Sequence, residues 1–199
     1  MFSLISGACK WFMQKQDVCL LIVGLDNSGK TTFLEQTKGI FTKNSTRQLS
    51  RIPPTIGLNV ATMDVDGFHV IFWDVGGHKS MRSLWNKYYK DAHGIIFLID
   101  SSDEERIKES REELRKVFIC EDLRELPILI CANKQDIVDA VEPEIIYKSL
   151  QPIIESNMMK HEVNFAATSA LTCEGLKQSI LWLIHSASKT QRSKNYKSR

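Results

Sequence analysis

Short apolar runs alternate with amphipathic stretches along most of the chain. The apolar runs have the length and the Val, Ile, Leu and Phe content typical of strands. They lie at 18–23, 58–65, 69–73, 94–99, 128–132 and 163–167. Helical patterns begin at Lys30, near Lys79, at Asp103, near Pro143 and near Glu174. This alternation predicts a three-layer α/β fold, in which about five helices cover a six-stranded, mostly parallel sheet.

Local signals sharpen this picture at three places. Residues 64–67 read Asp-Val-Asp-Gly, which is typical of a tight hairpin turn, so we expect the second and third strands to pair antiparallel at one edge of the sheet. Ser102 followed by Glu105 predicts a capping box at the third helix. The polar stretch 39–53 predicts a long loop, and such loops in compact domains are usually functional or disordered.

The pattern predicts one domain, residues 17–188, with an appendage at each end. Residues 1–16 predict an amphipathic helix that lies in a membrane interface or in a groove of its own protein, or else a frayed terminus packed on the body. Its apolar face comprises Phe2, Leu4, Ile5, Ala8, Cys9, Trp11, Phe12 and Met13. Residues 189–199 predict a basic, flexible tail that is either simply solvated or attracted to anionic lipid.

Composition narrows the function classes. The 199 residues include 26 Lys and Arg and 24 Asp and Glu, for a formal net charge of +2, which argues against a dedicated nucleic-acid binder. The five cysteines contain no C-x-x-C pair, which argues against a disulfide framework or zinc site and favours a cytoplasmic protein. We expect no membrane span and no secretory signal. Phe2 replaces the glycine that myristoylation requires.

A phosphate-binding loop follows the first predicted strand. Residues 24–31 match G-x-x-x-x-G-K-[ST], and a helical pattern follows, as the motif requires. Its glycines let the backbone wrap a phosphate with exposed N–H groups, and the helix N-terminus adds a positive dipole. Lys30 is expected to reach the β- and γ-phosphates. The predicted contacts are Gly24, Leu25, Asp26, Asn27, Ser28, Gly29, Lys30, Thr31 and Thr32.

Residues 133–136, Asn-Lys-Gln-Asp, predict guanine as the base. They follow a predicted strand at its carboxyl end, where ligands bind in open parallel sheets. The Asp136 carboxylate can accept hydrogen bonds from guanine N1–H and the 2-amino group, and adenine offers neither donor. Asn133 is expected to brace the loops and the Lys134 stem to cover the base. Beyond the last strand, the predicted contacts are Ser169, Ala170, whose N–H would donate to guanine O6, and Leu171.

Two further segments are candidate sensors of the γ-phosphate. Asp74 ends an apolar strand, so we expect it to hold Mg²⁺ through water, with the Gly77 N–H on the γ-phosphate. Thr55 ends the long loop and is expected to bind Mg²⁺ through its hydroxyl and the γ-phosphate through its N–H. With the Thr31 hydroxyl, these residues form the predicted metal site.

In this order, the motifs resemble those of small GTP-binding proteins of the Arf family. The matching stretches are 24–32, 54–59, 73–77, 133–136 and 168–171, and the likeness covers nearly the whole chain. The resemblance implies the P-loop GTPase fold, slow hydrolysis of GTP to GDP, and exchange factors, activating proteins and effectors as partners. The start without glycine, the extended loop and residues 32–36 are most like an Arf-related, Golgi-associated branch. That branch implies an acetylated Met1, reversible attachment to trans-Golgi membranes and a role in vesicle traffic, with a monomeric protein and no nucleic acid.

The main departure from the family is His78, which stands where glutamine usually orients the attacking water. The resemblance implies that Lys30, Gly77 and residue 78 act in catalysis. His78 either positions water or turns outward, in which case the protein is a slowly hydrolysing, GTP-loaded scaffold. The family's effector surface maps to Leu58, Trp73 and Tyr88, although Leu58 replaces the usual phenylalanine. A third reading, an ATPase or nucleotide kinase, is disfavoured by residues 133–136.

Overall fold

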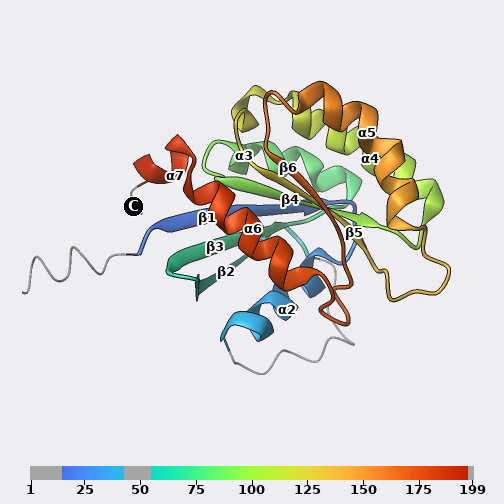
Figure 1. Cartoon of the computed structure of the whole chain (residues 1–199), viewed down its shortest axis with the longest axis horizontal. Coiled ribbons are helices and arrows are strands. Elements are labelled where there is room, and N and C mark those ends of the chain that lie inside the picture. Colours follow the sequence, from blue (N-terminus) through green and yellow to red (C-terminus); the bar gives the residue numbers. More distant parts are fainter. Residues whose placement is uncertain (1–14, 43–54, 197–199) are drawn as a thin grey trace, which may run out of the picture.

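The computed structural model describes residues 15–42 and 55–196, which form a sheet covered on both faces by helices (Figure 1). The strands are β1 (Asp17–Gly24), β2 (Leu58–Val65), β3 (Phe68–Val75), β4 (Gly94–Asp100), β5 (Ile128–Asn133) and β6 (Val163–Ala167). Their order is β2-β3-β1-β4-β5-β6. Every neighbouring pair is parallel except β2 and β3. The predicted fold class is therefore confirmed, whereas the predicted helix at residues 1–16 falls almost entirely outside the described residues.

The β2–β3 hairpin is the antiparallel edge that the sequence predicts. Its two-residue turn places Asp66 at φ 47° and Gly67 at φ 86°. Positive φ at both turn positions matches the twist of the flanking strands, which explains the Asp-Gly pair. The register pairs Val65 with Phe68 at the turn and Leu58 with Val75 at the other end.

The helices divide between the two faces of the sheet (Figure 1). One face is covered by α3 (Trp85–Tyr89), α4 (Glu104–Ile119) and α5 (Pro143–Asn157), and the other by α2 (Lys30–Thr42) and α6 (Leu176–Ser188). Short 3₁₀ turns, η2 (Lys79–Leu84) and η3 (Glu121–Leu123), and a final helix, α7 (Gln191–Asn195), complete the described chain. β4 is buried at every position because helices lie on both of its faces.

Two local predictions need correction. α2 continues to Thr42, so residues 39–42 of the predicted loop are helical, and residues 43–54 lie outside the described part of the chain. The N-cap of α4 is Asp103, whose side chain accepts a hydrogen bond from the Arg106 N–H at 3.1 Å. Ser102 instead donates to Asp100 Oδ1 through its N–H (3.0 Å) and its hydroxyl (2.6 Å). A carboxylate in the preceding strand therefore competes successfully for the Ser102 side chain.

Within the predicted basic tail, residues 191–195 form the short helix α7, while the flexibility of the tail stays a prediction. The Thr190 side chain caps α7 by accepting from the Ser193 N–H. The Arg192 guanidinium donates to three backbone carbonyls, those of Tyr89 (2.7 Å), Ala92 (3.1 Å) and Asp122 (2.8 Å). These contacts hold α7 beside the starts of β4 and β5.

The described residues contain neither a membrane-spanning helix nor a disulfide bond. Over residues 15–42 and 55–196, the helices are all too short or too polar to cross a bilayer. Within the same ranges the cysteines are unpaired, namely Cys19, Cys120, Cys131 and Cys173.

Candidate functional site

The phosphate loop joins β1 to α2, and its backbone accepts glycine alone at two positions. Gly24 has φ 142°, and a Cβ there would lie 2.3 Å from the Leu98 carbonyl oxygen. Gly29 has φ 90°, and its Cβ would lie 2.5 Å from Asn133 Nδ2. Asn27 is also left-handed (φ 62°), a conformation that asparagine tolerates. The motif therefore adopts the tight wrap that a phosphate cradle requires.

Lys30 lies buried at the start of α2, directly after this loop. Its Nζ donates to the Leu25 carbonyl at 2.6 Å, and that carbonyl also accepts from the Ser28 hydroxyl at 2.8 Å. Burial lowers the pKa of Lys30 to about 8. A buried cation with only backbone partners is suited to receive an anion, which would restore its ordinary pKa. Thr32 follows as the third residue of α2.

The three residues predicted to bind metal converge at one point. The Thr31 hydroxyl donates to Asp74 Oδ2 at 2.7 Å and lies 2.7 Å from the Thr55 hydroxyl. The Thr55 hydroxyl also donates to Asp74 Oδ2, at 3.2 Å. Asp74 is fully buried, and burial raises its pKa. Within the described residues its Oδ1 has no hydrogen-bond partner. Hydroxyl and carboxylate oxygens, one of them unpartnered, fit the oxygen-rich coordination of Mg²⁺.

Gly77 lies directly against the phosphate loop. A Cβ at Gly77 would lie 2.3 Å from the Gly24 carbonyl oxygen and 2.5 Å from the Asp26 nitrogen, so no side chain fits there. The neighbouring Gly76 N–H donates to the Gly57 carbonyl at 3.0 Å, which ties this segment to the one that carries Thr55. The two predicted γ-phosphate sensors are thus linked to each other and placed at the loop.

His78 lies outside this cluster of buried groups. Its side chain is exposed, and its Nδ1 is 2.9 Å from the Ser80 hydroxyl on η2. The catalytic role of His78 stays a prediction.

Asn133 braces the loops, as the sequence predicts. Its Nδ2 donates to the Ser28 carbonyl at 2.8 Å, and its Oδ1 accepts from the Ala170 N–H at 2.9 Å and the Thr168 hydroxyl at 3.3 Å. The Ala170 N–H, expected at guanine O6, is therefore engaged with Asn133 in this structure. Asn133 connects the phosphate loop to the loop after β6.

The other predicted base contacts gather beside Asn133. Lys134 is left-handed (φ 71°), and its Nζ pairs with Asp100 Oδ2 at 2.6 Å, which holds the stem of the side chain in place. The exposed Asp136 accepts at Oδ1 from the Ser169 hydroxyl at 2.6 Å, which orients the carboxylate. Leu171 has 59% of its surface exposed. The Asp136 carboxylate, which is predicted to bind guanine, is therefore accessible and is held by a hydrogen bond from the loop after β6.

Ionic contacts that the sequence did not reveal surround the phosphate loop. Arg106 on α4 donates to Asp26 Oδ1 (2.6 Å) and to the Asp26 carbonyl (3.1 Å). Arg82 on η2 donates through Nε to the Gly77 carbonyl at 3.0 Å. No motif contains these arginines. Asp100 was predictable in principle, because it ends β4 at the same sheet edge as Asp74 and Asn133.

Of the predicted effector residues, Leu58 is exposed, whereas Trp73 and Tyr88 are half-buried against the core. Leu58 and Val60 on β2 have 37% and 50% of their surface exposed, and Ile56 has 85%. The Trp73 and Tyr88 rings lie against each other with centroids 5.8 Å apart. Neighbouring exposed apolar side chains such as Leu58 and Val60 are typical of protein-binding surfaces.

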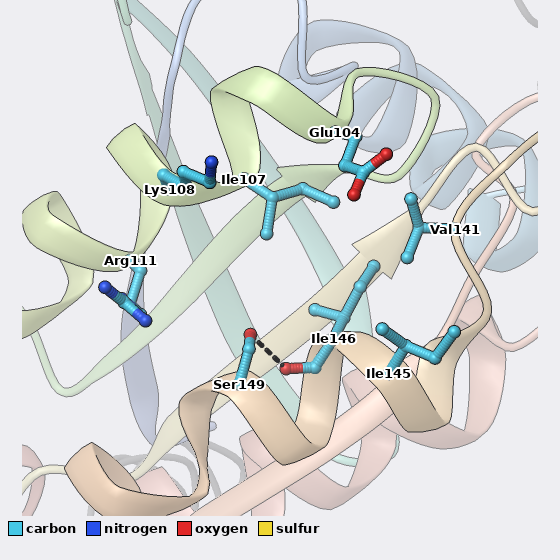
Figure 2. A pocket seen from close by; sticks show the side chains of 8 residues that line it. All are labelled: Glu104, Ile107, Lys108, Arg111, Val141, Ile145, Ile146 and Ser149. Carbon is cyan, nitrogen blue, oxygen red and sulfur yellow. Dashed lines mark hydrogen bonds between the residues drawn. The ribbon is translucent and has the colours of Figure 1, made fainter.

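A separate cavity of about 180 Å³ opens between α4 and α5 (Figure 2). Ile107, Val141 and Ile146 supply apolar walls, and Lys108 and Arg111 add charged groups. None of the residues predicted to bind nucleotide lines it. It is therefore separate from the phosphate loop, where the sequence predicts the nucleotide.

Comparison with known proteins agrees with this geometry. The sequence model described as "Arf: ADP-ribosylation factor family" matches residues 5–187. The chain is 44% identical over 186 residues to human ADP-ribosylation factor-related protein 1, covering 92% of each chain. It is 42% identical over 195 residues to ADP-ribosylation factor-like protein 3 of Saccharomyces cerevisiae, covering 98% of each. Among solved structures, the Arl6 BBS3 small GTPase of Trypanosoma brucei with bound GppNp superposes with TM-score 0.75 at 30% identity, over 87% of this chain and 98% of that one.

Proposed function

The chain belongs to the ADP-ribosylation factor family of small GTP-binding proteins, and from this premise we propose that it is a magnesium-dependent switch that regulates Golgi vesicle traffic. Membership of the family makes it a GTP-binding regulatory protein and a GTP hydrolase, with exchange factors, activating proteins and effectors as the general partners. The metal, the membrane, the monomeric state and the location belong to the proposal.

The proposed switch function rests mainly on one observation. The groups that would sense the γ-phosphate lie close together at the phosphate loop. Thr31, Thr55 and Asp74 come from three separate segments, and their side-chain oxygens lie within 3.2 Å of one another in the hydrogen bonds they form. Gly77 packs against the same loop. The γ-phosphate and its metal would hold Thr55 and Gly77 in place, and loss of the γ-phosphate would release both.

The chain's own groups divide the work of binding and hydrolysis. The backbone N–H groups of residues 24–29 and the Lys30 ammonium balance the charge of the phosphates. The Gly77 N–H donates to the γ-phosphate, and the Asp136 carboxylate accepts from guanine. Thr31, Thr55 and Asp74 would hold Mg²⁺, which would supply positive charge to balance the phosphates.

Titration of fluorescent GTP and GDP analogues tests the nucleotide and metal parts. We expect micromolar or tighter binding with Mg²⁺ present and a loss of GTP affinity in Thr31→Asn, since that variant removes a hydroxyl aimed at Asp74. Thr42→Asn, at the far end of α2, is the matched control. A purified chain indifferent to guanine nucleotides at micromolar concentrations contradicts the proposal.

Membrane attachment is tested with liposomes. Deleting residues 2–14 should leave nucleotide binding intact and abolish GTP-dependent liposome binding, because this segment carries the apolar face. Membrane retention that survives the deletion rules this mode of attachment out. Imaging the full-length protein beside Thr31→Asn tests the location: the parent should gather at trans-Golgi membranes and the variant should disperse.

A second candidate, a GTP-loaded scaffold that hardly turns over, is favoured by the position of His78. Its exposed side chain contacts Ser80 and not the buried cluster. Single-turnover hydrolysis by the parent and by His78→Gln, with and without an activating protein, separates the two candidates. Faster hydrolysis by the glutamine variant supports the scaffold, and equal rates remove it.

A further inference from the structure

Arg82 makes three hydrogen bonds next to the nucleotide site, and none of the predicted functions uses it. Only 9% of its side chain is exposed. Its Nε donates to the Gly77 carbonyl at 3.0 Å, and its Nη1 donates to Glu109 Oε1 at 2.8 Å and to Glu113 Oε1 at 3.2 Å. Its Nη2 lies 3.9 Å from Asp26 Oδ1. One guanidinium therefore contacts the Gly77 segment, α4 and the edge of the phosphate loop.

α4 presents its charged partners on one face. Arg106, Glu109 and Glu113 are spaced three and four residues apart, so they project from the same side of the helix. Arg106 donates a hydrogen bond to Asp26 in the phosphate loop, while the two glutamates accept hydrogen bonds from Arg82. The hydrogen bond from Arg82 holds the pKa of Glu109 below its usual range. The same helix thus anchors the phosphate loop and the Gly77 segment side by side.

The contact at Gly77 matters because the two polar groups of one peptide segment face different partners. The Gly77 carbonyl is held by Arg82, and the Gly77 N–H is the group that would meet the γ-phosphate. We propose that Arg82 is a positioning residue that holds Gly77 against the phosphate loop and so couples recognition of the γ-phosphate to α4. This inference rests on the proposed switch and adds a residue and a helix that its motifs do not include.

If Arg82 holds Gly77 in place, it should strengthen the binding of GTP but not that of GDP. GDP has no γ-phosphate, so it gains nothing from an ordered Gly77. GTP gains a donor that is already in place, without the entropic cost of ordering the segment. By linkage, GTP in turn stabilises the contacts of Arg82 with Glu109 and Glu113.

The test measures the dissociation constants of GDP and of a non-hydrolysable GTP analogue, with Mg²⁺, for the full chain. Arg82→Gln should weaken the GTP analogue by about tenfold to a hundredfold, the range for a lost charge-assisted contact. GDP affinity should stay within about twofold. Arg82→Lys should recover part of the loss, since one ammonium cannot reproduce the planar fork that spans Gly77 and two carboxylates. Arg111→Gln removes a half-exposed arginine from α4, is the matched control and should change neither constant.

Glu113→Gln supplies a second route if Arg82→Gln does not fold. It preserves size and helix while removing one charge from the Arg82 partners, so the GTP analogue should weaken by several-fold and GDP should not. Equal losses for both nucleotides in these variants, or no loss for either, overturn the positioning role. A parent chain that binds neither nucleotide refutes the switch itself, so the two failures remain distinguishable.

Discussion

The two ends of the sheet are built in opposite ways. At the carboxyl ends of the strands, charged and polar groups converge but remain open to a ligand: Lys30 has only backbone partners, and Asp74 Oδ1 has none in the described chain. At the amino ends most buried polar groups are paired within the chain, although His93 Nε2 has no partner among the described residues. Arg192 reaches three carbonyls, and Gln16 Nε2 donates to the Ser188 carbonyl and the Ser193 hydroxyl, each at 2.9 Å.

This difference between the two ends of the sheet suggests that one end serves ligand binding and the other serves stability. Polar groups left unmatched inside a protein cost free energy, so they persist where a ligand repays the cost. Substitutions at the carboxyl end should therefore act on affinity, and those at the amino end on unfolding. Single substitutions at each end test whether affinity and stability depend on opposite ends of the sheet.

Lys30→Met should have the largest effect. Removing the cation from a buried anion site should weaken both GTP and GDP by on the order of 100-fold or more, because the phosphates lose their charge partner. The free energy of unfolding without nucleotide should fall little or rise, since a buried charge is removed. Nucleotide titration and urea denaturation measure the two quantities.

Lys38→Met is the control for that variant, because Lys38 lies on the same helix and pairs with Glu35 at 2.6 Å. It should leave nucleotide affinity unchanged. A Lys30 variant that binds nucleotide normally but unfolds far more easily would reverse the assignment of the two ends.

The residues at the carboxyl end were predictable from sequence because their signals are local. Each motif follows an apolar run, and parallel strands bring the ends of those runs to one edge. Gly24, Asp74 and Asn133 could therefore be placed together before any coordinates. The sequence could not reveal that the Ala170 N–H donates to Asn133, because that choice depends on two loops meeting in space.

The amino end was poorly predicted for the converse reason. α7 has five residues and too little apolar periodicity to signal a helix. It is held by Arg192, whose carbonyl partners at Tyr89, Ala92 and Asp122 lie 70 to 103 residues away in the sequence. Arg82 was missed likewise, because its contacts with Glu109 and Glu113 join separate elements. Basic residues near a terminus are usually solvated, so only tertiary structure distinguishes a docked arginine.

His93 should make stability depend on pH at the amino end. Its Nδ1 accepts from the Cys19 N–H at 3.0 Å, its Nε2 is buried without a partner among the described residues, and the Tyr196 ring lies edge-on 4.9 Å away. Burial, and then the positive charge of Arg192, lower the pKa of His93 from 6.5 to about 4. The unfolded chain therefore takes up a proton between these values while the folded chain does not.

Protonation of His93 in the unfolded chain makes the protein less stable as pH falls. Stability from neutral His93 is complete above pH 6.5 and is lost as pH falls toward 4, by about 3 kcal/mol at most. His93→Asn keeps an acceptor for the Cys19 N–H and should flatten this part of the profile. Urea denaturation at half-unit pH steps measures it, and identical slopes in parent and variant would refute the assignment to His93.

Arg192→Gln should cost about 2 kcal/mol of unfolding free energy, because three carbonyls lose a charged donor. Nucleotide affinity should change less than twofold, since none of these contacts reaches the phosphate loop. Lys194→Gln, exposed on the same short helix, is the control and should be neutral. A selective loss of GTP affinity in Arg192→Gln would show that the two ends are not independent.

The smallest effect should come from the tip of the β2–β3 hairpin. His185 Nε2 on α6 lies 2.7 Å from Asp66 Oδ2, with 49% and 55% of the two side chains exposed. At the other end of the hairpin, the Gly76 N–H to Gly57 bond joins residues packed at the site. An exposed pair contributes little because water and salt screen it, so His185→Gln should cost under about 1 kcal/mol, and less at 1 M NaCl. Denaturation at two salt concentrations, with the exposed Gln178→Ala as control, measures this. A loss of several kcal/mol would mean that the hairpin is held as firmly at its tip as at the nucleotide site.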